Sequence, residues 1–75
     1  MSDDVKEYWA LDAQMCRLRE VAAAAATYQE ADKAYEMLTD ADVRAVAVFE
    51  RLSMEDRVRV NDELWRRARR EKARL

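Results

Sequence analysis

The chain has 75 residues and a mass of 8.8 kDa, so we expect residues 1–75 to form a single domain with a small core. It contains no Gly, Pro or His, which argues against all-β folds, glycine-rich phosphate loops and histidine-based catalytic or metal sites. Charged residues make up 40% of the chain, yet the net charge is only −2, because an acidic segment (residues 1–42) is followed by a basic one.

The first predicted helix covers residues 3–37 and begins with a capping signal. Ser2 precedes two acidic residues, a pattern that caps a helix N-terminus and complements its dipole. Apolar residues then recur at alternating steps of three and four, with a change of phase near Thr27. Thr27 with Glu30 three residues later also has the form of a capping box, so an alternative is a break there into two helices.

Two further boundaries are predicted at Thr39 and Ser53. Each precedes an acid-rich first turn and has an acidic residue three positions later, in the style of a capping box. The second helix is therefore expected at residues 40–52 and the third at residues 54–74. The sequence predicts an all-α fold, a small bundle of three helices, or of four if the first helix breaks near Thr27.

The second predicted helix is apolar on two sides, and such a helix must be covered from both directions. The two sides comprise Val43, Val46 and Ala47, and Ala45, Val48, Phe49 and Leu52. We expect the neighbouring helices to cover them, with Phe49 and Trp65 largely buried as anchors. A helix over residues 3–37 would be about 50 Å long and would overhang the second helix, which is about 20 Å long. We therefore also expect a homodimer that covers the remaining apolar surface.

Acidic residues are numerous, so a carboxylate metal site or an acid–base pair has to be considered. Glu63 with Arg67, and Asp62 with Arg66, have the four-residue spacing of ordinary surface ion pairs. Carboxylate di-iron sites in helical bundles also use histidine ligands, which this chain lacks. We therefore expect no metal, no cofactor and no enzymatic activity.

Cys16 is the single cysteine, which excludes an internal disulfide and favours a reducing compartment. We expect it to be a small buried hydrophobe. The alternatives are an intermolecular disulfide and a reactive thiol. The longest uncharged run, residues 21–29, is too short to cross a membrane, so a cytoplasmic protein without membrane contact is expected.

The C-terminal segment is the strongest charge feature of the sequence. Arg59, Arg66 and Arg70 fall near one outer line of the third helix, with Arg67 and Arg74 alongside. Such a ridge is suited to phosphates or to an acidic protein surface, although cations also simply stabilise the C-terminal end of a helix. The aromatic residues fall at seven-residue spacing or within the apolar stripes, which favours a core or a dimer seam. Among them, Tyr28 and Tyr35 are the candidates for an exposed binding patch, because Tyr is enriched at interface hot spots.

These observations predict a non-catalytic helical interaction module, namely a regulator, adaptor or inhibitor that presents a helix face to a partner protein. Small acidic helical proteins without motifs are common among antitoxin-like regulators and phage-type inhibitors of host machinery, an analogy of size and composition only. The alternative is a nucleic-acid-binding regulator that uses the Arg-rich C-terminal helix. A purely structural subunit of a larger assembly is a third hypothesis.

Overall fold

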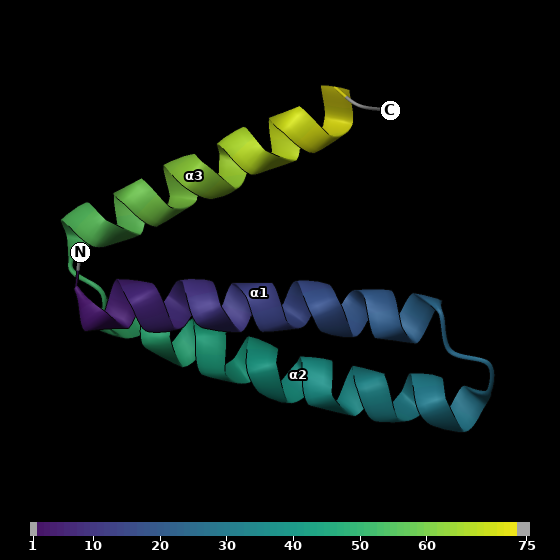
Figure 1. Cartoon of the computed structure of the whole chain (residues 1–75). Helices are drawn as coiled ribbons and strands as arrows, with labels where there is room; N and C mark the ends of the chain where they lie inside the picture. Colours follow the sequence, from purple (N-terminus) through teal and green to yellow (C-terminus); the bar gives the residue numbers. More distant parts are fainter. Residues whose placement is uncertain (1, 74–75) are drawn as a thin grey trace.

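The computed structural model describes residues 2–73, and this range contains three α-helices and no strands. The helices are α1 (Asp3–Ala23), α2 (Tyr28–Arg51) and α3 (Met54–Ala73). Figure 1 shows that α1 and α2 form an antiparallel hairpin, and that α3 diverges from it toward its C-terminal end. The predicted all-α, three-helix fold is confirmed, with helix boundaries that differ from the prediction.

The break near Thr27 is confirmed, and the continuous helix over residues 3–37 was wrong. The hydroxyl of Thr27 accepts a hydrogen bond from the backbone N–H of Glu30 (3.2 Å), and the Glu30 carboxylate accepts one from the N–H of Ala26 (3.1 Å). These bonds satisfy donors that a helix start leaves unpaired. The reversal lets the apolar side of α1 pack on α2, which outweighs the helix propensity of the alanine run at residues 22–26.

The predicted boundary at Thr39 was also wrong, because α2 continues through it. The Thr39 hydroxyl donates to the backbone carbonyl of Tyr35 (2.9 Å) and so sits inside the helix. The apolar residues of α2 keep helical steps of three and four across Thr39, and packing on α1 stabilises the uninterrupted helix. They are Ala34, Leu38, Ala41, Ala45, Val48 and Leu52.

The hairpin core lies between α1 and α2. It joins Leu11, Met15 and Leu18 of α1 to Ala41, Ala45 and Val48 of α2. The two alanines allow a close approach of the helices, and the larger residues of α1 fill the space. The opposite side of α2 is open: Val43 and Val46 are exposed, so the expectation that α2 is covered from both directions within the chain was wrong.

A second, smaller core joins α3 to the start of the hairpin. Val5, Leu52 and Val60 are buried together, with the half-buried Phe49 and Leu64 packed against them. Arg57 of α3 donates to the backbone carbonyls of Phe49 and Glu50, which lie at the C-terminal end of α2. The first half of α3 is therefore docked both by apolar packing and by capping of its neighbour.

Trp65 is not one of the core anchors, contrary to the prediction, because 67% of it is exposed. The side of α3 that faces the core runs through Val60, which is only 2% exposed, and Leu64. Five residues beyond Val60, Trp65 lies about 140° around the helix from it. Phe49, the other predicted anchor, is only partly buried.

Candidate partner-binding surfaces

The polar contact between α1 and α3 centres on Arg67. Its guanidinium lies 4.2 Å from the ring centroid of Trp9 and 3.5 Å from the Asp12 carboxylate. Its Nε also donates to Glu63 within α3 (3.1 Å). The cation–π contact and the half-shielded ion pair fix the middle of α3 against α1. No local spacing in the sequence signals this contact, because residues 12 and 67 are far apart in the chain.

Glu63 binds three of the arginines predicted to form the basic ridge or to lie beside it. Arg66 (3.5 Å), Arg67 (3.1 Å) and Arg70 (3.2 Å) all contact its carboxylate. The hydrogen bond from Arg67 lowers the pKa of Glu63, burial opposes this, and the charges of Arg67, Arg70 and Arg66 add to the lowering. The positive charge of the ridge is therefore partly compensated.

The other ridge residues have different surroundings. Arg59 is exposed and forms an ion pair with Glu55 one turn earlier (2.7 Å). Arg74 lies outside the described residues, so its place on the ridge stays a prediction. Arg59, Arg66 and Arg70 fall on one side of α3, as the sequence spacing predicts. Their role in partner binding also stays a prediction.

The two predicted tyrosines lie on α2 and face solvent. Tyr28 is 90% exposed and Tyr35 is 55% exposed, and their seven-residue spacing puts them two turns apart on one side. Tyr28 begins α2, at the end of the hairpin opposite to the link from which α3 departs (Figure 1). The tyrosines and the basic ridge therefore belong to two different surfaces.

The sequence interpretation missed the exposed apolar side of α3. Trp65 borders a shallow depression together with Asp62, Arg66 and Arg69. Val58 lies seven residues earlier on the same side and is also exposed. The four-residue step from Val60 to Leu64 and the seven-residue step from Val58 to Trp65 are both helical spacings, so the sequence alone does not select the buried side of α3.

Cys16 is exposed, so its prediction as a buried hydrophobe was wrong. It follows Trp9 by seven residues and therefore shares the side of α1 that Trp9 presents to α3. That part of α1 is uncovered because α3 has already diverged from the hairpin (Figure 1).

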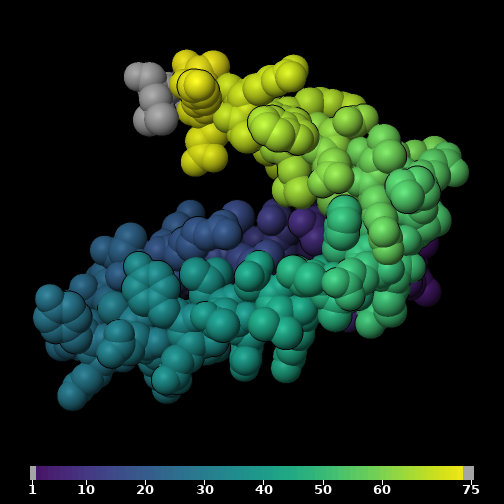
Figure 2. Space-filling view, turned by 180° about the vertical axis from the view of Figure 1, so that it is seen from behind, coloured from purple at the N-terminus to yellow at the C-terminus, as the bar shows by residue number. Residues whose placement is uncertain are grey.

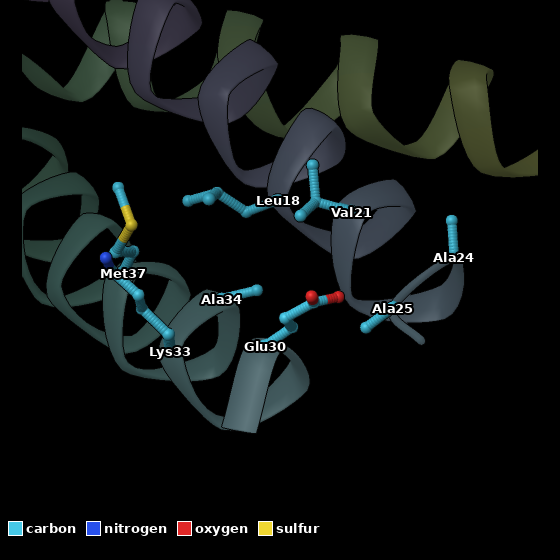
Figure 3. A pocket seen from close by; sticks show the side chains of 8 residues that line it. All are labelled: Leu18, Val21, Ala24, Ala25, Glu30, Lys33, Ala34 and Met37. Carbon is cyan, nitrogen blue, oxygen red and sulfur yellow. The ribbon is translucent and has the colours of Figure 1, made fainter. Parts of the chain in front are cut away.

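An apolar groove of about 470 Å³ lies at the turn end of the hairpin. Figure 3 shows its lining side chains, which come from the end of α1, the connecting segment and the first turns of α2. Alanines form much of its wall, including Ala24, Ala25 and Ala34, while Lys33 and Glu30 are its charged members. Small side chains leave this end of the hairpin less filled than its middle.

Within residues 2–73, no group of three or more His, Cys, Asp or Glu side chains is arranged to hold a metal ion. The same part of the chain contains no helix with the length and hydropathy needed to cross a membrane. Comparison with known proteins finds no matching family model, no similar curated protein and no similar solved structure. The residues and their geometry are therefore the basis for any functional proposal.

Proposed function

We propose that the chain is a non-catalytic helical interaction module, which acts as a regulator, adaptor or inhibitor by presenting a helix face to a partner protein. The observation that carries this proposal is the exposure of large apolar side chains on all three helices. They are Val21, Tyr28, Tyr35, Met37, Val43, Val46, Met54, Val58 and Trp65. So many exposed large side chains on so small a protein are typical of interaction surfaces.

The tyrosine side of α2 is the first contact surface that we propose. Tyr28 and Tyr35 each offer a large, rigid side chain with a polar tip, and they lose little conformational entropy on binding. The second proposed contact is the basic ridge, with Arg59, Arg66 and Arg70 facing an acidic protein surface. Because Glu63 already holds two of these arginines, the ridge would contribute specificity more than affinity.

We further propose a homodimer in the cytoplasm. Association of two copies would cover apolar side chains that one copy leaves open. A reducing compartment would keep the exposed thiol of Cys16 free, and the fold needs no disulfide.

Affinity capture with matched variants tests the proposal. The tagged full chain is used as bait in a lysate of the cells that express it, and captured proteins are quantified by mass spectrometry. We expect Y28A/Y35A to lose a captured protein at least tenfold, and R66Q/R70Q to weaken its capture. V21A is the matched control, because Val21 is an exposed apolar residue of α1 that lies outside both proposed contact surfaces. Equal capture by all four chains, or no protein enriched over an empty bait, contradicts the proposal.

A nucleic-acid-binding regulator is less well supported, since Glu63 and Glu55 compensate part of the ridge charge. A salt titration of binding to DNA and RNA separates the two functions. Phosphate contacts would give a steep loss of affinity with rising salt, and a protein-binding module would show no such complex.

A further inference from the structure

The exposed side of α3 carries apolar residues followed by basic ones. Met54, Val58 and Trp65 are exposed, and steps of four and seven residues put them on one side of the helix. Arg69 and Lys72 continue this side toward the C-terminus, and neither forms an ion pair within residues 2–73. This side, the α3 stripe, is turned away from the buried Val60.

The exposed side of α2 carries the opposite charge. Val46, Val43 and Tyr35 are exposed on it. Asp32 and Glu36 flank Tyr35 in the N-terminal half of this side, and both are exposed and unpaired in the described chain. We call this side the α2 stripe. The basic residues of α2 lie on a flank of the helix, between this side and the buried one, and they are Lys33, Arg44 and Arg51.

The two stripes match in length as well as in charge. Val58 and Arg69 are eleven residues apart on α3, and Val43 and Asp32 are eleven residues apart on α2. Each pair therefore spans about 16 Å. When the helices are aligned antiparallel with Val58 against Val43, Arg69 meets Asp32. The same alignment brings Trp65 level with Glu36, one residue from Tyr35, so aromatic contact and charge pairing agree on one register to within one residue.

The two stripes do not meet within one chain. Val60 and Arg67 hold α3 against α1, which leaves the α3 stripe on the outer side of the helix. Figure 2 shows an open gap between the C-terminal part of α3 and the hairpin. The complement to each stripe is therefore available only from another molecule, and the matching surface is present on a second copy of this chain.

We propose that two copies form a symmetric dimer in which the α3 stripe of each copy lies antiparallel on the α2 stripe of the other. This inference rests on the proposed function, in which exposed helix faces bind protein, and it names one partner and one register. The two contacts are related by a two-fold axis, so every complementary pair is formed twice. Such an arrangement covers Trp65, Val58, Val43 and Tyr35 and leaves the ridge side of α3 free. The second copy therefore competes with a different partner for Tyr35.

A charge-reversal swap tests this dimer. R69E/K72E changes the α3 stripe and D32K/E36K changes the α2 stripe, with residues of good helix propensity at exposed positions. Sedimentation velocity at hundreds of micromolar should give the wild type twice the mass of the 8.8 kDa chain. Each variant alone should dimerise at least tenfold more weakly, and an equimolar mixture of the two should recover a 1:1 dimer. R44E is the control outside the α2 stripe, at an exposed residue, and it should dimerise like the wild type.

A wild type that stays monomeric overturns the proposal, as does a mixture that recovers no dimer although each variant keeps its helical circular dichroism. Loss of the dimer in R44E to the same degree also overturns it, because the effect would then follow net charge alone. The proposed function is tested separately, by capture of a different protein. If the wild type is monomeric and still captures a partner through Tyr28 and Tyr35, the proposed function stands and the proposed dimer does not.

Discussion

The hairpin and α3 show how similar helical patterns lead to different degrees of burial. The α1–α2 hairpin buries continuous apolar seams from both helices, with alanines that allow close contact. In α3, Val60 is buried and Leu64 is partly buried, and the residues that follow are exposed and rich in arginine. The hairpin therefore provides most of the stability, whereas α3 provides an exposed surface on a limited base.

The largest expected effect is on the hairpin core. L11A removes a buried side chain between α1 and α2 and should lower the free energy of unfolding by about 2–5 kcal/mol. This is a large share of the stability of so small a domain. Thermal denaturation followed by circular dichroism measures the loss. V21A, on the exposed side of α1, should have a free energy of unfolding within about 0.5 kcal/mol of the wild type. An equal loss of stability in L11A and V21A would contradict a core at Leu11.

A smaller and more local effect is expected from V60A. It removes part of the contact with Val5 and Leu52, at a cost of about 1.5–2.5 kcal/mol. Amide hydrogen exchange should accelerate by about tenfold or more in α3, while amides of the hairpin core keep their protection. W65A is the control on the same helix. In the monomer, its α3 amides should exchange at rates close to those of the wild type. Equal acceleration in all three helices would show that α3 and the hairpin unfold as one unit.

The sequence predicted the helical class, the cap at Ser2, the boundary at Ser53 and, as an alternative, the break near Thr27. These features depend on local chemistry, such as the hydroxyl of Ser53 that accepts from the N–H of Asp56. Thr39 has the same local signal, yet packing of α2 on α1 overrides it. Local capping signals therefore mark possible helix ends, and tertiary packing selects among them.

The side of α3 that docks could not be predicted from periodicity. Val58 and Val60 alternate along the helix, and either could begin an apolar side. The choice depends on contacts with Val5, Trp9 and Asp12, which lie about fifty residues away in the chain. The exposure of Trp65 follows from that choice. For the candidate surfaces, the pair of Glu63 with Arg67 could be predicted from its spacing, and Tyr28 and Tyr35 could be named as candidates. The binding of Arg66 and Arg70 by the same carboxylate required the structure.

The smallest expected effect is the acid sensitivity of α3. The pKa of Glu63 in the folded chain lies below its ordinary value of 4.5, chiefly because Arg67 donates to the carboxylate. Above pH 4.5 the carboxylate is ionised in both states, and its stabilisation is fully present. As the pH falls through the lowered pKa of the folded chain, the unfolded state takes up the proton first, and this stabilisation is lost.

Exchange of α3 amides between pH 6 and pH 3, corrected for the intrinsic exchange rate, measures this effect. The wild type should lose α3 protection on acidification more steeply than E63Q, which has no carboxylate to titrate. The difference should shrink in about 1 M salt, where charges separated by more than about 3 Å are screened. Parallel pH profiles for the two chains would show that Glu63 does not couple to docking. The contact of Arg67 with Trp9 would then hold α3 without the carboxylate, because a cation–π contact does not titrate in this range.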